Sequence, residues 1–357
     1  QKMIMEISAQ ITGIKYKPLL CRELRTYSIK ELERALSMDA TFLLYMNGHK
    51  LAVSHWVSAK RTRSYPYARV YDSLAFAGKK VTIIPILKDE GFGGDRDYLQ
   101  WDTISLMSLI GVYVIVSYYA SASPNPRFSD KITEQRFDSS QIKEQLHALL
   151  SYQSDALHWN LLQVDKAHEL LHKALDAYDK ISKKLKIRVH SREAAEKRLQ
   201  ELIKGKESFM RLSRMLAQRA RDRESVTIQP KEKLVGKKAA LIIKNHLGGC
   251  YFFTADEACL KGKNVFLIES KHTVGKGLPA LEDIKDGLFK MILFTNFSNT
   301  TIGNRKVRCI PILKLTTKGK FKIADLSKKE KKTLALLKKE SKINGFRLMA
   351  NEVILRS

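Results

Sequence analysis

Three residues in the carboxy-terminal third of the chain have types and spacing suited to phosphodiester chemistry. Asp256, Glu269 and Lys271 lie in the stretch TADEACLKGKNVFLIESKHT at residues 254–273. Two neighbouring carboxylates can share a Mg²⁺ ion, which takes oxygen ligands and keeps positions open for phosphate oxygens. An adjacent ammonium can activate the attacking water or stabilise the charge of the transition state. The residue types therefore predict a Mg²⁺-dependent hydrolytic site.

A β-hairpin is the element that must bring these residues together. The segment KGKN at 261–264 suits a two-residue type II′ turn, with Gly262 at the first central position. Pairing outward from this turn places Asp256 opposite Glu269, and strand alternation puts Lys271 on the same face. Two carboxylates that close repel by about 3 kcal/mol at an effective dielectric constant of about 20, so we expect a cation between them.

The same stretch has a simpler interpretation, a cross-strand salt bridge at the edge of a sheet. Glu257 is also a candidate acid beside Asp256. Because alternation turns Glu257 to the opposite side of the strand, Asp256 is the better partner for Glu269.

The chain carries a large positive charge. Its 64 Lys and Arg against 37 Asp and Glu give a net charge of +27. A polyanion would offset the resulting self-repulsion, so nucleic acid is the expected partner; a solvated basic surface is the alternative. The DNA-binding candidates are Lys60, Arg61, Arg63 and Arg69, which alternate with tyrosines in SAKRTRSYPYAR, together with Lys276.

The predicted fold class is α/β, divided into three segments. Residues 1–130 are expected to form an α/β DNA-recognition domain, with a hairpin around Asn47 and Gly48 and a strand in YARVYDSLAF. Residues 138–222 carry apolar residues at helical spacing, which predicts one long helix after Asp138, a second after Ser191, and thus a helical hairpin arm. An internal scaffold is the alternative role for these helices.

The third segment, residues 226–357, is the predicted catalytic domain, with a mixed sheet core flanked by helices. Its expected helices lie at 231–246, at 280–295 and in the lysine-rich stretch SKKEKKTLALLKKESK, and KVRCIPILKL is an expected strand. The four cysteines lie far apart without metal-binding spacing, which favours reduced thiols and a cytoplasmic location.

A weak second copy of the hairpin pattern occurs in VYDSLAFAGKKVTIIPILKDEG. Asp72 and Lys88 are 16 residues apart, close to the 15 residues from Asp256 to Lys271, but Ile86 takes the place of the glutamate. Residues 1–130 are therefore either a degenerate nuclease-like fold or an unrelated domain with a coincidental hairpin.

The pattern Asp256, Glu269 and Lys271 resembles the PD-(D/E)XK nuclease superfamily. The phrase NVFLIESKHTVGKGLPALEDIKDGLFKMILF is similar to type II restriction endonucleases, although Ala255 stands where the family has its proline. The resemblance covers about 70 residues. It implies that Asp256 and Glu269 are metal ligands for Mg²⁺, that Lys271 is the third catalytic residue, and that the helix at 280–295 packs behind the sheet.

The resemblance also implies a function: Mg²⁺-dependent cleavage of double-stranded DNA at a specific short sequence, with a cognate methyltransferase in the same system. A homodimer is the economical expectation, because a duplex needs two cuts. A repair or recombination nuclease of the same fold and a non-catalytic basic DNA-binding protein are the alternatives. The sequence indicates no membrane span.

Overall fold

The computed structural model describes residues 5–60, 65–196, 237–245, 250–319 and 321–355. These residues form two compact units, both of mixed α/β class, so the predicted fold class is confirmed at this level. Unit 1 contains the described residues up to Arg22 and those from Lys237 onward. Unit 2 contains the described residues from Glu23 to Glu196.

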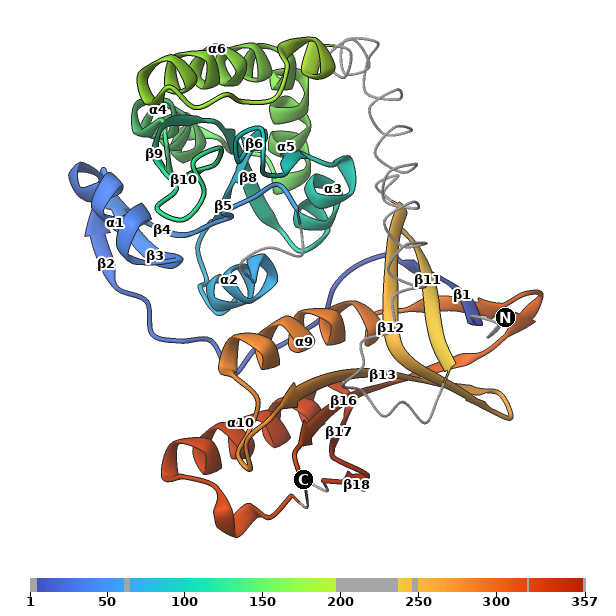
Figure 1. The fold of residues 1–357 in the computed structure, drawn as a ribbon. Helices are drawn as coiled ribbons and strands as arrows, with labels where there is room; N and C mark the ends of the chain where they lie inside the picture. Colours follow the sequence, from blue (N-terminus) through green and yellow to red (C-terminus); the bar gives the residue numbers. More distant parts are fainter. Residues whose placement is uncertain (1–4, 61–64, 197–236, 246–249, 320, 356–357) are drawn as a thin grey trace. The chain divides into compact units, whose positions relative to one another are not determined.

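Within the described residues, unit 1 is built on one mixed sheet of nine strands (Figure 1). The central pairs β11–β12 and β12–β13 are antiparallel, whereas β1 runs parallel to β11, and β16 runs parallel to β13 and β17. In spatial order the strands are β15 (Arg305–Lys306), β14 (Ser298–Ile302), β1 (Met5–Ile11), β11 (Lys237–Asn245), β12 (Cys250–Lys261), β13 (Asn264–Thr273), β16 (Arg308–Thr317), β17 (Arg347–Ala350) and β18 (Val353–Ile354).

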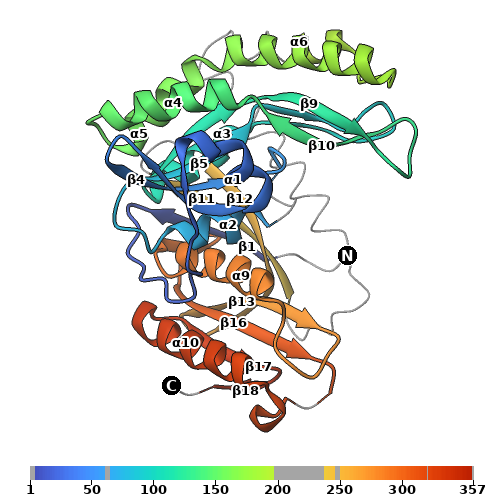
Figure 2. The same ribbon diagram turned by 90° about the vertical axis from the view of Figure 1, so that its left-hand side faces the viewer.

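Two helices cover opposite faces of this sheet, α9 (Leu281–Phe294) and α10 (Lys328–Asn344) (Figure 2). Both were predicted from the sequence and are confirmed. The apolar stripe of α9, Ile284, Leu288 and Ile292, is buried, as its helical spacing requires. A capping box starts α10, a left-handed glycine ends it, and the short 3₁₀ helix η2 (Ile323–Asp325) precedes it.

Two predictions for unit 1 are wrong. The helix expected at 231–246 is strand β11 over Lys237–Asn245, while residues 231–236 lie outside the described part. Its apolar run is buried in mid-sheet, and a buried strand cannot be distinguished from a buried helix by apolar residues alone. The predicted domain boundary at residue 1 is also wrong: strand β1 belongs to unit 1, where it lies between β11 and β14.

Unit 2 has a central five-stranded sheet with two small hairpins beside it, counted over its described residues. The central order is β2 (Thr26–Ser28), β3 (Thr41–Met46), β4 (His49–His55), β5 (Lys80–Pro85) and β8 (Val112–Ser117), and the small pairs are β6 (Leu87–Asp89) with β7 (Arg96–Tyr98) and β9 (Tyr119–Pro124) with β10 (Ile132–Phe137). The predicted turn at Asn47 and Gly48 joins β3 to β4, with φ of 49° and 77° at these residues.

Three helices of unit 2 stand in place of the single long helix predicted after Asp138: α4 (Ser139–Ser151), α5 (Ala156–Asp165) and α6 (Ala167–Leu185). Unit 2 also contains η1 (Ile29–Glu31), α1 (Leu32–Met38), α2 (Pro66–Ser73) and α3 (Trp101–Leu109). Asp138 caps α4 as predicted, but Asp155 caps a new helix by accepting a hydrogen bond from His158 N. The amphipathic spacing continues across the break, which is why it predicted one helix.

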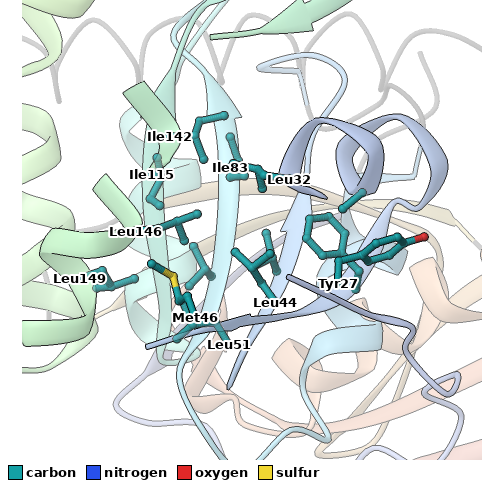
Figure 3. Close-up of a cluster of buried hydrophobic side chains, with 14 of the residues drawn as sticks. Tyr27, Leu32, Leu44, Met46, Leu51, Ile83, Ile115, Ile142, Leu146 and Leu149 are labelled. Carbon is teal, nitrogen blue, oxygen red and sulfur yellow. The ribbon is translucent and has the colours of Figure 1, made fainter. Parts of the chain in front are cut away.

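These helices form part of the unit 2 core, which supports the scaffold alternative over a projecting arm. Ile142, Leu146 and Leu149 of α4 pack against side chains of the central sheet such as Leu44 and Ile115 (Figure 3). Each buried side chain of this size contributes about 2 kcal/mol to folding. A helix follows Ser191 over residues 192–196, and the rest of the predicted second helix lies outside the described residues.

The second copy of the hairpin pattern is also a wrong prediction. Asp72 lies on helix α2, which begins with Pro66 at its first turn, and therefore cannot pair across strands with the residues before Lys88. Proline is favoured at that helical position, and this signal outweighs the β-forming composition of YARVYDSLAF. The pattern does not make residues 1–130 a degenerate nuclease-like fold.

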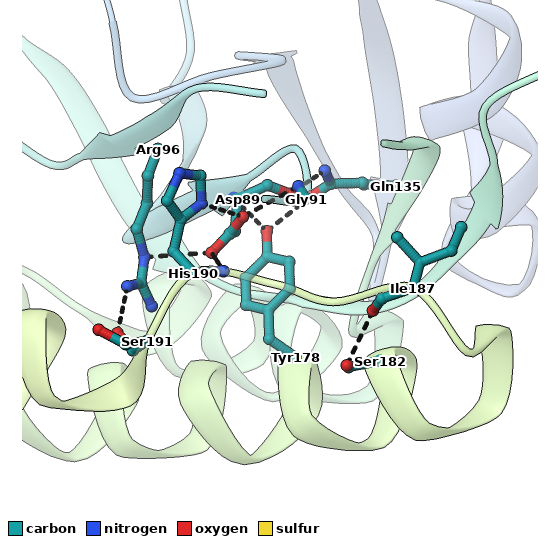
Figure 4. A network of polar contacts seen from close by, with 9 residues as sticks. All are labelled: Asp89, Gly91, Arg96, Gln135, Tyr178, Ser182, Ile187, His190 and Ser191. Carbon is teal, nitrogen blue, oxygen red and sulfur yellow. Dashed lines mark hydrogen bonds and ion pairs between the residues drawn. The ribbon is translucent and has the colours of Figure 1, made fainter. Parts of the chain in front are cut away.

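A buried carboxylate holds the hairpin β6–β7 of unit 2 (Figure 4). Asp89 has no exposed surface and accepts hydrogen bonds from Gly91 N and from Nδ1 of His190, at 3.0 and 2.8 Å. Nε of Arg96 lies 3.2 Å from its other oxygen, and Tyr178 from α6 accepts a hydrogen bond from Asp89 N. These contacts use both oxygens of Asp89, so we assign the cluster to structure.

Candidate active site

The hairpin β12–β13 has the predicted register as far as Glu257 opposite Ile268, one pair short of the predicted pairing of Asp256 with Glu269. Five residue pairs are formed, from Lys261 opposite Asn264 to Glu257 opposite Ile268. Gly262 has a φ of +60°, as the first central residue of a type II′ turn requires. The ladder between β12 and β11 has a bulge in this region, because Ala255 and Ala258 pair with residues only two apart on β11. Bulges re-aim side chains and often lie next to active sites.

Five charged side chains meet where β13 passes under α9. Nζ of Lys271 lies 3.1 Å from Oε1 of Glu269 and 2.7 Å from Oδ2 of Asp286. Nζ of Lys290 lies 2.8 Å from Oε2 of Glu269 and donates to the carbonyl oxygen of Thr254 at 3.3 Å. The fifth member is the carboxylate of Asp256 on β12. Asp256, Glu269, Lys271, Asp286 and Lys290 are called the charge cluster below.

Asp256 joins the cluster from β12 and has the weakest set of partners. Its Oδ2 accepts a hydrogen bond from Ser270 N at 2.7 Å, directly beside Glu269. Oδ1 makes no hydrogen bond or ion pair within the described residues. Burial, followed by the nearby charge of Glu269, raises the pKa of Asp256 from 3.8 to about 7, although Lys290 and the bond from Ser270 act against this.

The other acid on the same face behaves differently. Burial opposes the ionisation of Glu269, which is 2% exposed, but the ammoniums of Lys290 and Lys271 outweigh burial and lower its pKa. Burial likewise opposes the charge of Lys271, and Glu269 and Asp286 outweigh it and raise the pKa of this lysine. Lys271 therefore remains an ammonium at neutral pH and is suited to stabilise negative charge rather than to accept a proton.

When Asp256 is ionised, the cluster carries one negative charge in excess. Asp256, Glu269 and Asp286 supply three carboxylates, against the two ammoniums of Lys271 and Lys290. Glu269 and Asp286 are ion-paired, so the excess charge falls on Asp256. A cation is the partner that would satisfy the free oxygen of Asp256 without breaking either ion pair of Lys271.

The carboxylate oxygens of Asp256 and Glu269 are ligands of the kind that Mg²⁺ takes. No group of three or more His, Cys, Asp and Glu side chains that could enclose a metal occurs in the described part of the chain. Mg²⁺ is commonly held by one or two carboxylates and keeps several waters, whereas structural zinc needs a closed set of His and Cys ligands. Asp256, with its unpartnered oxygen, and Glu269 beside it are the residues that would hold this ion.

Glu257, the neighbour of Asp256, lies on the other face of the sheet. Its Oε1 is 3.6 Å from Nζ of Lys314, which also lies 2.8 Å from Oε1 of Glu352. Lys314 pairs in register with Ser270, so both point away from Glu269. Glu257 is therefore separated from the charge cluster by the sheet itself.

The DNA-binding candidates are not brought together by contacts in the structure. Lys60 forms an ion pair with Asp97 at 2.8 Å, and Nη1 of Arg69 donates to the carbonyl oxygen of His55 at 2.8 Å. Both contacts lie within unit 2 and hold the fold. Arg61 and Arg63 lie outside the described residues. Lys276 is exposed in the loop between β13 and α9 of unit 1.

Sequence reasoning missed Asp286 and Lys290. They are four residues apart on α9 and so lie on one side of this helix, one turn from each other. Gly287 was the available signal, because a glycine within a predicted helix indicates a close approach. A Cβ at this position would lie 2.7 Å from Cδ1 of Leu313 and 3.1 Å from Cε of Lys271.

No helix among the described residues is long and apolar enough to span a membrane. Comparisons with family models, with curated proteins and with solved structures give no match to this chain.

Proposed function

We propose that this chain is a Mg²⁺-dependent endonuclease that hydrolyses phosphodiester bonds of double-stranded DNA at a specific short sequence. The observation that carries the proposal is the charge cluster: two acids on neighbouring strands, one with a free oxygen, lie beside an ammonium held by two ion pairs. The resemblance to the PD-(D/E)XK superfamily, and to type II restriction endonucleases within it, adds to the proposal.

The surroundings of the cluster support the proposed fold. The resemblance implies a helix behind the sheet, and α9 packs against β13 and β16 in that way, with Gly287 in close approach to Leu313. The restriction-endonuclease-like core is thus proposed for β11, β12, β13, α9 and β16 of unit 1.

The residues divide the chemistry as follows. When bound, Mg²⁺ would supply Lewis-acid polarisation of the phosphodiester. Asp256 and Glu269 would hold the ion, and the ion would favour the charged form of Asp256. Lys271, fixed by Glu269 and Asp286, directs its ammonium charge at the negative charge that develops in the transition state. The raised pKa of Lys271 favours its ammonium form in the metal-free protein, so stabilisation of transition-state charge is the role proposed for it.

The net charge of +27 supports DNA as the substrate, because each phosphate neutralised by Lys or Arg adds to affinity. We propose unit 2 as the recognition part, a homodimer as the active form, and a methyltransferase of the same specificity in the same system. Lys60, Arg61, Arg63, Arg69 and Lys276 remain candidates for contact with DNA.

The test compares wild-type protein with Asp256→Asn on phage DNA, with and without Mg²⁺. We expect discrete fragments from the wild type with Mg²⁺ only, and at least about a hundredfold slower cleavage by the variant with unchanged DNA binding. Glu257→Gln is the matched control, one residue away on the other face, and should cut at the wild-type rate.

Three results would change the proposal. Equal cleavage by wild type and Asp256→Asn would refute the site. Binding without cleavage by the folded wild type on every DNA tested would favour a non-catalytic DNA-binding protein. Cleavage without defined fragments, or at branched DNA only, would favour a repair or recombination nuclease.

A further inference from the structure

Lys290 belongs to the charge cluster but not to the three-residue pattern in the sequence. Its ammonium contacts Oε2 of Glu269 on β13 and the carbonyl oxygen of Thr254 on β12, at 2.8 and 3.3 Å. It thus bridges the same two strands that carry the proposed metal ligands. Both contacts are oxygens of the kinds that Mg²⁺ takes.

We propose that Lys290 is a resident counter-ion of the metal site: its ammonium occupies the cation position between β12 and β13 in the metal-free protein and weakens the binding of divalent cations. The inference rests on the proposed function, because it concerns how the same site is loaded.

The two lysines of the cluster differ in how firmly they are held. Lys271 has two carboxylate partners, Glu269 and Asp286, at 3.1 and 2.7 Å. Lys290 has one carboxylate partner and one carbonyl among the described residues. A divalent cation that reaches Glu269 therefore displaces Lys290 more readily than Lys271, and the four-carbon stem of a lysine lets the ammonium move away.

The charge count gives the direction of the effect. With Asp256 ionised, the wild-type cluster sums to −1, so a divalent cation would bring it to +1 unless Lys290 leaves. Without the ammonium of Lys290 the cluster sums to −2, and the same cation makes it neutral. In a partly buried site the neutral arrangement is the more stable of the two.

The experiment is a calorimetric titration of the metal-free protein with MgCl₂ and, separately, with CaCl₂ at pH 8. We expect Lys290→Met to bind either ion about tenfold or more tightly than the wild type does. Lys290→Arg, which keeps the charge, should bind like the wild type. Lys314→Met is the matched control, because it removes a buried, carboxylate-paired lysine from the other face of the same sheet.

A second measurement follows the Mg²⁺ concentration that gives half-maximal cleavage, which should fall by the same factor in Lys290→Met. If Lys290→Met does not fold, Lys290→Gln gives the same comparison, because its amide can still donate to Glu269.

The outcomes separate the two proposals. Unchanged or weaker metal binding by the variant, with binding by the wild type, would overturn the role of Lys290 and leave the metal site standing. Absence of metal binding by both folded proteins would overturn the metal site, and the role of Lys290 with it. An equal gain in Lys314→Met would also overturn the inference, because the effect would then not be specific to the cluster.

Discussion

Asp256→Asn should stabilise unit 1 at alkaline pH, although the residue replaced is the one on which proposed metal binding depends. Asp256 bears the unbalanced charge of the cluster, and its pKa is raised from 3.8 to about 7. Asparagine keeps the acceptor for Ser270 N and removes the charge beside Glu269. The substitution therefore relieves an electrostatic cost of the metal-free fold.

The magnitude and its sign follow from proton linkage. Between about pH 4 and pH 7 the unfolded chain has an ionised Asp256 while the folded chain keeps it protonated, so stability falls as pH rises through this window. A shift of about three pH units corresponds to roughly 4 kcal/mol. Because Asp256 is only partly buried and water screens its free oxygen, we expect about 2 kcal/mol at pH 8. The gain should vanish below about pH 3, where Asp256 is neutral in both the folded and the unfolded state.

The assay is denaturant unfolding at several pH values without divalent cations, followed by circular dichroism and by amide exchange of β12 and β13. The tryptophans provide an internal control, because Trp56, Trp101 and Trp159 all lie in unit 2 and their fluorescence reports that unit. A variant no more stable than the wild type at pH 8, or a gain that does not change with pH, would refute the charge count. Glu257→Gln should show no such pH-dependent gain.

Three further substitutions test other parts of the argument. Glu269→Gln should cost about 3 kcal/mol, measured by the same unfolding assay, because it leaves the partly buried ammonium of Lys290 without its carboxylate; a cost below about 1 kcal/mol would contradict the ion pairs. Gly287→Ala should lower stability by about 1–2 kcal/mol despite the better helix propensity of alanine, since the new Cβ meets Leu313; a net gain in thermal stability would contradict the close approach of α9. Asp89→Asn should cost about 3 kcal/mol in the tryptophan-monitored transition of unit 2, because Arg96 loses a buried partner, and an unchanged midpoint would show that this pair is not a structural anchor.

The sequence predicted the local geometry of the site because that geometry is set by short-range rules. A two-residue turn at Gly262 fixes the register of β12 against β13, and the period of two then determines which side chains share a face. The helix α9 follows from its apolar spacing alone. These inferences need only neighbouring residues, so no information about the rest of the chain was required.

Two of the errors concern contacts that local rules do not determine. The parallel pairing of β1 with β11 joins Met5 to Ala239 across more than half of the chain. No pattern within either segment indicates that the other is its partner strand. At the break between α4 and α5 the ammonium of Lys79 binds the carbonyl oxygens of Leu149 and Tyr152 at 2.7 and 2.6 Å and so contributes to the end of α4. A distant lysine at the end of a helix leaves no mark on the helical spacing itself.

The charge cluster contains more acids than bases, and this surplus bears on the proposed function. A cluster selected for stability alone would balance acids and bases, as Lys271 balances Asp286, and would place a neutral residue at the bulge of β12. Instead the bulge lies where β12 carries Asp256, whose oxygen has no partner among the described residues and whose ionisation destabilises the metal-free fold. Natural sequences accept such local conflicts mainly at functional sites. The surplus carboxylate is the feature that folding does not explain and that the proposed binding of a cation would explain.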